Sequence, residues 1–238
     1  MDIKIIYEDN DVLVADKPAG VVVFPEGESL KSKEKTVIDY LTEQKPELKN
    51  VGEAPRYGIV HRLDKDTSGI LLVAKSSESL IFLQKQFINR EVEKKYVCLV
   101  EGTLENDPPT GGGEIKTLIA RAKGDPRKQR AYSELNAPKS AREAITEYKV
   151  LQRYKDYTLL EVQIKTGRRH QIRCHLSYLK HPVAGDKLYN FKNSKIPDGL
   201  TRQFLHSAYL KIQLPSSEIK EFKSELPEEL KNVLKNLS

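Results

Sequence analysis

Cysteine is scarce in this chain, with Cys98 and Cys174 the only two among 238 residues. They stand in unrelated contexts, so they offer neither a disulfide framework nor a cage of thiolates for a metal ion. No stretch approaches the roughly 20 consecutive apolar residues that a membrane-spanning helix needs. The first residues are acidic where a secretory peptide has a basic region followed by an apolar run. We therefore expect a cytoplasmic protein that neither enters a membrane nor is exported.

Internal repeats, heptad runs and long disordered segments are also absent, and the chain is instead a series of short strand-like and helix-like segments. The turn-prone Asp9-Asn10-Asp11 predicts a hairpin between the first two strands. Lys17-Pro18-Ala19-Gly20 ends the second strand, because proline cannot donate to a sheet ladder. The segment 69–75 contains the uninterrupted apolar run Ile70 to Ala74, as in a strand that is covered on both faces. We predict strands over 3–7, 12–15, 69–75, 96–100, 145–151, 157–164 and 208–214, and a loop over 107–113.

Apolar residues at helical spacing predict four helices. Thr36 begins the first, which ends before Pro46. Ser77 caps the second and Thr166 the third, in which Ile172 points into the core. The fourth helix packs on the body of the protein. The predicted core stripes are Leu80, Ile81, Leu83, Phe87 and Ile88 in the second helix, and Leu226, Leu230, Val233, Leu234 and Leu237 in the fourth.

These elements predict an α+β fold, with a mixed, mainly antiparallel central sheet flanked by helices and loops. The length lies at the upper end of what a single domain holds. We therefore expect one domain over residues 1–238, with a core of about 5–215 and a helical tail over 216–238.

The basic surplus of the chain is regional. Residues 121–180 contain 15 Lys or Arg against 6 Asp or Glu, a net charge of +9, whereas the remainder contains 25 against 28. Such a surplus is either a solvated lysine-rich surface or a face that binds phosphate groups.

The most informative segment is His61-Arg62-Leu63-Asp64-Lys65-Asp66-Thr67-Ser68-Gly69, directly before the apolar strand. A polar loop at the entrance to a core strand is where a rigid scaffold presents side chains to a ligand. By itself, such a loop is more often a turn in which Asp64 or Asp66 accepts hydrogen bonds from backbone amides.

A second charged segment, over 166–176, opens the third helix. Arg169 and Arg173 are four residues apart and so share a helix face, where guanidinium groups either pair with a carboxylate or hold phosphates. Alone, this pattern indicates a solvated basic face. Together with the first loop, it indicates a paired site.

A metal-dependent hydrolase or deaminase is the first alternative, because five histidines gather around these motifs. The spacing argues against a metal: His170 and His175 are five residues apart rather than four, and no Cys-x-x-Cys is present. Phosphate transfer is disfavoured as well, because no glycine-rich run precedes Lys65. The histidines in question are His61, His170, His175, His181 and His206.

The charged segments resemble those of the RluA-type family of pseudouridine synthases. The family motif HRLDxxTSG is matched at His61, Arg62, Leu63, Asp64, Thr67, Ser68 and Gly69. Further matches follow in the family's order from about 5 to 215, at Lys17-Pro18-Ala19-Gly20, Lys95-Tyr96, 166–173, His181-Pro182, Gly185-Asp186 and Leu205-His206. Asn190 and Ser207 depart from the usual glycine and alanine. The resemblance implies the pseudouridine synthase fold, with a cleft across its middle, as a catalytic domain without an S4-type RNA-binding module.

By this resemblance the protein is an RNA-modifying isomerase that converts uridine in ribosomal or transfer RNA stem-loops to pseudouridine. We expect it to act as a monomer, without metal or cofactor. Asp64 is implied as the catalytic carboxylate, Tyr96 as the ring that stacks on the target base, and Arg173 as the basic partner of Asp64. Attack on C1′, attack on the base and removal of a sugar proton all stay open as mechanisms. The alternative function is a non-catalytic RNA-binding or ribosome-assembly protein on the same fold.

RNA recognition is expected to rest on basic groups near these motifs. Arg62, two residues before Asp64, is placed to fill the space left by an extruded nucleotide. The segment 121–130 resembles a variable strand-connecting region of the family, and a basic hairpin or loop there would hold the RNA backbone. The expected RNA-binding residues are His61, Arg62, Arg121, Lys123, Arg127, Lys128, Arg130, Arg168, Arg169 and His170.

Overall fold

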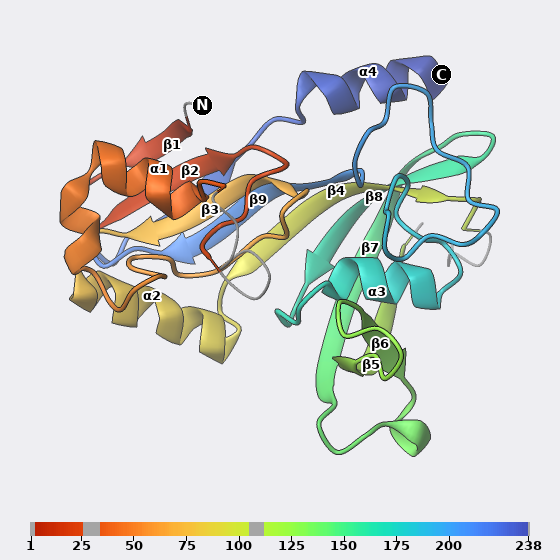
Figure 1. Cartoon of the computed structure of the whole chain (residues 1–238), viewed down its shortest axis with the longest axis horizontal. Helices are drawn as coiled ribbons and strands as arrows, with labels where there is room; N and C mark the ends of the chain where they lie inside the picture. The colour runs from red at the N-terminus through yellow and green to blue at the C-terminus, as the bar shows by residue number, and fades with distance from the viewer. Residues whose placement is uncertain (1–2, 26–33, 105–111, 238) are drawn as a thin grey trace. The chain divides into compact units, whose positions relative to one another are not determined.

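The computed structural model describes residues 3–25, 34–104 and 112–237 (Figure 1). The chain divides into two compact units. Unit 1 comprises residues 1–93 and 207–225, and unit 2 comprises residues 94–206 and 226–238. Antiparallel strand pairing predominates in both units, and the predicted α+β fold with a mainly antiparallel sheet is confirmed. The expectation of one domain stays a prediction.

Unit 1 is built on a sheet whose centre is β3, all seven residues of which are buried as predicted. The predicted hairpin of β1 and β2 is confirmed, and its turn is held by Asp9, which accepts hydrogen bonds from the backbone N–H groups of Asp11 and Val12. In sheet order, the strands are β1 (Lys4–Glu8), β2 (Val12–Lys17), β3 (Ser68–Ala74), β9 (Leu205–Gln213) and β10 (Ile219–Lys223).

Strand β10 was not predicted, since it lies within the expected helical tail. It pairs antiparallel with β9 and buries Phe222 in the core of unit 1. Its sequence, IKEFK, has three charged residues, and only Phe222 is buried. Only tertiary pairing with β9 distinguishes it from a loop.

Thr36, predicted to begin the first helix, is the N-cap of α1 (Val37–Gln44). Its side chain accepts from the Asp39 backbone, while the Asp39 side chain accepts from the Thr36 backbone, which completes a capping box. A 3-10 helix, η2 (Pro46–Asn50), follows.

Helix α2 (Ser77–Asn89) corrects two predictions. Its cap is Ser76 rather than Ser77, because the Ser76 hydroxyl oxygen accepts from the Ser79 backbone. Ile81 and Ile88 were predicted to face the core, but they are 69% and 79% exposed. The face of the helix that carries Leu80 packs into the core. Successive residues are rotated by about 100° around the helix axis, so Ile81, next to Leu80, points away from that face.

Unit 2 contains a second run of paired strands. The predicted hairpin of β7 and β8 is confirmed. In order of pairing, the strands are β4 (Glu93–Glu101), β8 (Tyr157–Ile164), β7 (Arg142–Arg153), β5 (Gly112–Arg121) and β6 (Gln129–Tyr132). Short 3-10 helix η3 (Glu134–Asn136) follows β6.

The loop predicted over 107–113 falls largely outside the described residues, and where it is described it is wrong. Gly112 and Gly113 open β5. At Gly113, an added Cβ would lie 2.6 Å from the hydroxyl oxygen of Tyr148 on the paired strand. These glycines therefore serve close packing between strands rather than a turn.

Two helices complete unit 2, α3 (Gln171–Tyr178) and α4 (Glu228–Leu237). Helix α4 buries Leu230 and Val233 in a core cluster of unit 2, which confirms that the tail helix packs on the body. Leu226, Leu234 and Leu237 line the same cluster. Every helix among the described residues is too short or too polar to cross a lipid bilayer.

Candidate active site

Asp64 lies in unit 1, on the loop that leads into β3, and is partly exposed. The loop closes on itself where the Thr67 backbone N–H donates to the Asp64 carbonyl at 3.1 Å. Gly69, at φ +109°, carries the chain into β3, and an added Cβ would lie 2.2 Å from the Ser207 carbonyl oxygen. Glycine is thus required here, and the scaffold fixes where Asp64 is presented.

A buried lysine holds this loop in place by hydrogen bonds. Lys17 is 0% exposed, and its ammonium donates to the carbonyl of Lys65 at 2.9 Å and to that of Pro18 at 2.7 Å. The Gly20 backbone N–H donates to the same Lys65 carbonyl at 2.9 Å. The residue after Asp64 is therefore held by two donors. From sequence, Lys17 only marked the end of a strand, and its position in the motif match was the one signal of a further role.

His61, predicted to bind RNA, has its described contacts inside unit 1. Its Nε2 accepts from the Leu72 backbone N–H at 3.1 Å, and its ring stacks on Phe87 with centroids 4.9 Å apart. An acceptor Nε2 means that the ring is held without a proton on that nitrogen. These contacts anchor the start of the Asp64 loop, and RNA binding by His61 stays a prediction.

Arg62 and Arg56 both stand over the buried ring of Phe24. Their Cζ atoms lie 5.7 Å and 5.0 Å from its centroid, and both side chains are exposed. Arg56 makes no ion pair within the described part of the chain. Arg56 was not predicted as a site residue, because it lies outside the motifs that match the family.

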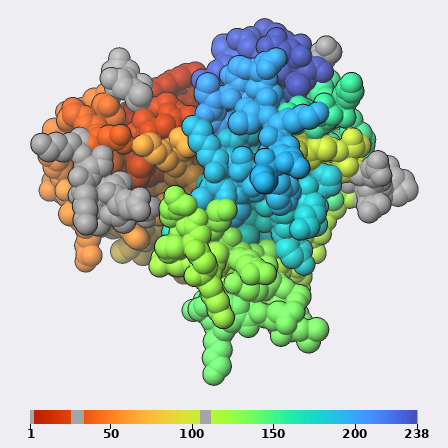
Figure 2. Space-filling model, turned by 45° about the vertical axis from the view of Figure 1, so that its right-hand side comes forward, coloured from red at the N-terminus to blue at the C-terminus, as the bar shows by residue number. Residues whose placement is uncertain are grey.

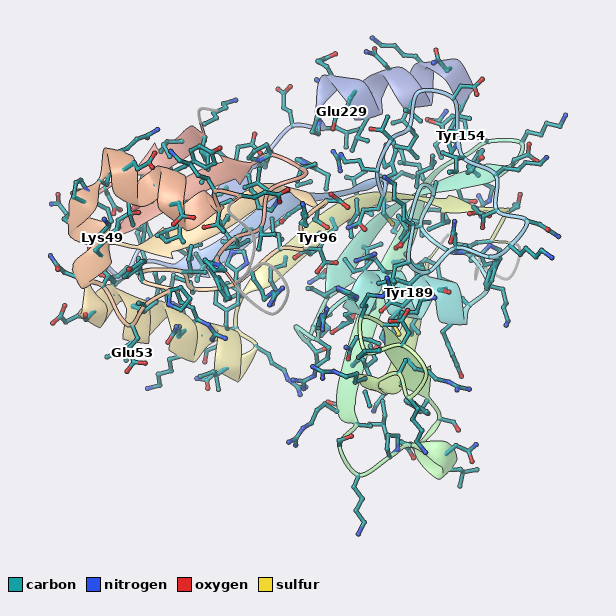
Figure 3. The ribbon with its side chains drawn as sticks, in the orientation of Figure 1. Lys49, Glu53, Tyr96, Tyr154, Tyr189 and Glu229 are labelled. Atoms are coloured by element: carbon teal, nitrogen blue, oxygen red, sulfur yellow. The ribbon has the colours of Figure 1, made fainter. Side chains whose placement is uncertain are left out.

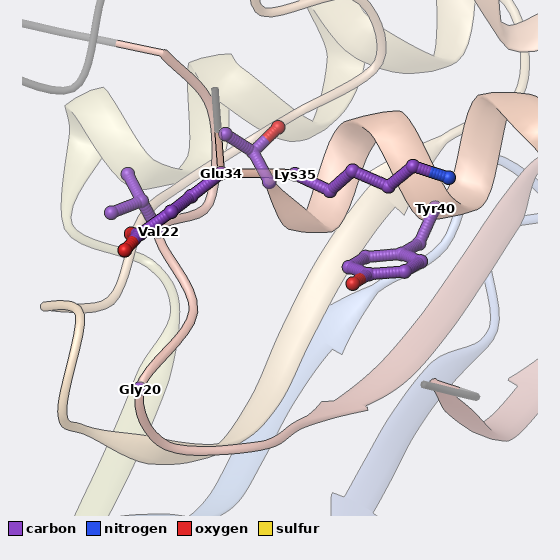
Figure 4. A pocket seen from close by; sticks show the side chains of 6 residues that line it. Gly20, Val22, Glu34, Lys35 and Tyr40 are labelled. Atoms are coloured by element: carbon purple, nitrogen blue, oxygen red, sulfur yellow. The ribbon is translucent and has the colours of Figure 1, made fainter. Parts of the chain in front are cut away.

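Unit 1 also contains a pocket of about 290 Å³ near this loop (Figure 4). In the close-up, Tyr40 and Lys35 lie on the α1 side and Gly20 lies on the opposite loop. Glu34 joins the pocket to the Asp64 loop through an ion pair with Lys65 at 3.0 Å. The lining residues, none of them a predicted site residue, are Gly20, Val22, Glu34, Lys35, Thr36 and Tyr40.

Tyr96 lies in unit 2, on β4, and is 6% exposed (Figure 3). Lys94, two residues earlier, lies on the same face of the strand and is also buried. Burial lowers the pKa of Lys94 to about 8. No sequence pattern marked Lys94 as a buried lysine, because the neighbouring Lys95 was the one matched to the family.

Arg173 lies on α3 of unit 2 and pairs with Asp186. Its Nε donates to Oδ2 at 2.6 Å and its Nη2 to Oδ1 at 2.9 Å, and the two side chains are 9% and 0% exposed. Asp186 Oδ1 also accepts from the backbone N–H groups of Leu188 and Tyr189. The carboxylate thus orients the guanidinium with bidentate geometry. The expected partnership of Arg173 with Asp64 joins residues of different units and stays a prediction.

The predicted start of α3 is wrong. The helix begins at Gln171, after His170 at φ +54°, and Thr166 does not cap it. Thr166 instead accepts from the Ile145 backbone and donates to the Gln171 side chain at 2.7 Å. Arg169 therefore precedes the helix and is exposed, whereas Arg173 is buried, so the two do not share a helix face.

His175 is enclosed by two threonines. Its Nε2 lies 2.9 Å from the Thr117 hydroxyl and its Nδ1 lies 2.8 Å from that of Thr146. Burial lowers its pKa to about 4, so the ring is neutral at physiological pH. Within the described ranges, no group of three or more His, Cys, Asp or Glu side chains could hold a metal ion.

The predicted basic hairpin is present, formed by β5, β6 and the turn between them, and lies at the surface (Figure 2, green). We call residues 121–130 the basic hairpin. Arg127 is tied to Asp125 by two hydrogen bonds, which hold the pKa of that carboxyl at about 2. Its exposed cationic side chains are Arg121, Lys123, Arg127 and Arg130, with Lys128 half-buried.

Two other predicted RNA-binding residues have partners in unit 2. Arg168 Nε donates to the Glu143 carbonyl at 2.9 Å. His170 Nδ1 lies 3.1 Å from the Tyr189 hydroxyl. Arg169 is exposed beside them. These contacts fix the segment before α3, and its role in RNA binding stays a prediction.

Comparison with known proteins gives a consistent result. The sequence model of a family described as RNA pseudouridylate synthase matches residues 11–178. An uncharacterized RNA pseudouridine synthase of Bacillus subtilis is 37% identical over 238 residues, which cover 100% of this chain and 73% of that protein. Another, from Aquifex aeolicus, is 42% identical over 200 residues, or 83% of this chain and 59% of that one.

A ribosomal large subunit pseudouridine synthase D of Borreliella burgdorferi is 37% identical over 236 residues, covering 98% of this chain and 68% of its own. Among solved structures, human RNA pseudouridylate synthase domain containing 1 matches with a TM-score of 0.76 and 25% identity. The match covers 95% of this chain and 84% of the human one.

Proposed function

We propose that this chain, which belongs to the RNA pseudouridylate synthase family of RNA-modifying isomerases, converts uridine in large-subunit ribosomal RNA to pseudouridine, with Asp64 as the catalytic carboxylate. The choice of ribosomal RNA is supported by relatives named as ribosomal large subunit synthases. The observation that supports the catalytic role of Asp64 is the structure of its loop. The carbonyl of the next residue, Lys65, accepts hydrogen bonds from the Lys17 ammonium and the Gly20 N–H, which fix its position. A side chain on so rigid a support suits chemistry that needs fixed geometry.

The isomerisation breaks the bond from N1 of uracil to C1′ of ribose and forms one from C5 to C1′. C5 loses its proton, and N1 ends with one, so no oxidant or second substrate is consumed. One carboxylate suffices because the leaving base returns as the nucleophile. Asp64 attacks C1′, attacks the base or removes a sugar proton, and the first of these has a parallel in retaining glycosidases.

Arg173 and Tyr96 complete the proposed site. We assign Arg173 to keep Asp64 ionised beneath the bound base, with Asp186 orienting the guanidinium through its two hydrogen bonds. Tyr96 supplies a flat ring for the uracil, and its hydroxyl can handle the C5 proton. The target nucleotide must leave the stack to reach these groups.

The RNA backbone is held by the basic hairpin, by Arg169 and by Arg62, to which we add Arg56. Exposed guanidinium groups suit phosphate binding because they are weakly hydrated and bidentate. We further propose that the protein acts in the cytoplasm as a monomer, without metal or cofactor.

Tritium release from RNA that contains 5-tritiated uridine tests the assignment of Asp64. Wild type should release label, and Asp64→Asn should release none while retaining RNA affinity. Asp66→Asn, on the same loop, is the matched control and should stay active. Wild type that releases no more label than Asp64→Asn from any cellular RNA would favour the binding-only alternative. Pseudouridine mapping in total RNA, with and without the gene, identifies the target.

A further inference from the structure

We propose that Tyr189 is a positioning residue that couples the basic hairpin to Arg173. The proposal rests on the function assigned above to Arg173 and to the hairpin, and all of the contacts that carry it lie within unit 2. Tyr189 is 7% exposed and lies beside α3 (Figure 3).

The hydroxyl of Tyr189 reaches the basic hairpin. Its oxygen accepts from the backbone N–H of Gln129 at 2.6 Å, and Gln129 is the first residue of β6, directly after the hairpin turn. The same oxygen lies 3.1 Å from His170 Nδ1, and the two rings meet edge to face at 86°. Burial raises the pKa of the phenol, so the hydroxyl keeps its hydrogen at neutral pH and can donate it to His170.

The other end of Tyr189 holds Arg173. The guanidinium carbon lies 5.1 Å from the ring centroid. The Tyr189 backbone N–H also donates at 3.0 Å to Asp186, the carboxylate that binds Arg173 through both oxygens. Arg173 is thus bounded by the ring of Tyr189 and by a carboxylate that Tyr189 helps to fix.

A tyrosine ring and its hydroxyl form one rigid body, so a displacement of Gln129 is transmitted to the ring that faces Arg173. Phosphates bound by the hairpin restrain β6 and therefore restrain the guanidinium. A core tyrosine without this role would contribute only packing, in the cluster that it shares with Ile119, Ala131, Ala144 and Cys174. The two roles differ in what removal of the hydroxyl alone does to the reaction rate.

The substitution Tyr189→Phe in the full chain distinguishes the two roles, because it removes the hydroxyl and keeps the ring. The ring stays, while Gln129 loses its acceptor. We expect the single-turnover rate at saturating RNA to fall roughly tenfold while the Kd for RNA changes less than about twofold. The acid limb of the pH–rate profile should move to higher pH, because a displaced guanidinium favours the ionised form of Asp64 less. Tyr132→Phe, on the same strand β6, is the matched control and should change neither quantity.

Arg130→Gln provides a second arm that does not depend on the folding of Tyr189→Phe. In the wild-type background, loss of this hairpin charge should weaken binding and also lower the saturated rate. In the Tyr189→Phe background, it should weaken binding alone. Arg130→Gln with an unchanged saturated rate, or Tyr189→Phe with an unchanged rate and pH profile, overturns the coupling. If wild type is no more active than Asp64→Asn, the proposed function itself has failed.

Discussion

Arg173 and Asp186 form a buried, bidentate ion pair, with the guanidinium Nε 2.6 Å from Oδ2 and Nη2 2.9 Å from Oδ1. Removing one member of such a pair leaves the other charge buried without its partner, at a cost of about 3–5 kcal/mol. We expect Asp186→Ala to lower the free energy of unfolding by an amount in this range, measured by urea denaturation.

Arg202 and Glu229 provide the control for this prediction. Arg202 is buried, but Glu229 is 59% exposed, at a distance of 2.8 Å. Glu229→Ala leaves a guanidinium that still donates to the carbonyls of Gln203 and Leu205. We expect a loss of about 0–1 kcal/mol. Equal losses in the two variants would contradict the importance given to the Asp186 pair.

His175 predicts a dependence of stability on pH. Its pKa is about 4 in the folded protein against 6.5 when unfolded, so the unfolded chain binds a proton more readily. The stabilisation is complete above pH 6.5 and is lost as the pH falls from there to about 4, by roughly 3 kcal/mol in total. Urea denaturation at pH 7.5, 6 and 5 measures this loss. His175→Gln removes the titrating group, and a variant whose stability falls as steeply as wild type would reject the assignment.

Much of the fold was accessible from the sequence because its strands carry period-two or fully apolar patterns. The seven buried residues of β3 and the hairpin of β7 and β8 are of this kind. Strand β10 was missed, and β5 and β6 were anticipated only as a basic hairpin or loop over 121–130, because these strands mix charged and apolar residues and are defined by pairing rather than by propensity.

Predictions of helix boundaries were wrong where side-chain hydrogen bonds, rather than the spacing of apolar residues, determine the end of the helix. Gln171 accepts from the Arg168 backbone and from the Thr166 hydroxyl, and this network delays the start of α3. The motif identified Asp64 as a candidate, yet its support comes from Lys17, 48 residues before Lys65 in the chain. No local pattern reveals that contact.

Lys17 should be essential to the Asp64 loop. Lys17→Met keeps the apolar length of the side chain but leaves the carbonyls of Lys65 and Pro18 without this donor. Losing hydrogen bonds from a charged, buried donor costs about 2–4 kcal/mol, and the loop should lose its fixed position. We expect lower thermal stability and slower tritium release.

Lys65→Gln is the comparison, since within the part of the chain that the structure describes its side chain forms only an exposed ion pair with Glu34. It should cost no more than about 1 kcal/mol. If Lys17→Met releases tritium at the wild-type rate, the loop does not depend on the ammonium.

Arg56 should contribute to RNA affinity through direct contact of its guanidinium group with one phosphate. Each phosphate contact with single-stranded RNA changes the slope of log affinity against log salt by about 0.7, and five such contacts give a slope of about −3.5. We expect Arg56→Gln to bind more weakly and to flatten the slope by about 0.7, measured by fluorescence anisotropy across a range of salt concentrations. Lys85→Gln, an exposed cation on α2, removes the same charge from the same unit. A surface charge that contacts no phosphate releases no counterion from the RNA, so that control should keep the wild-type slope. Equal flattening of the slope in both variants would show that Arg56 acts only through the net charge of the protein.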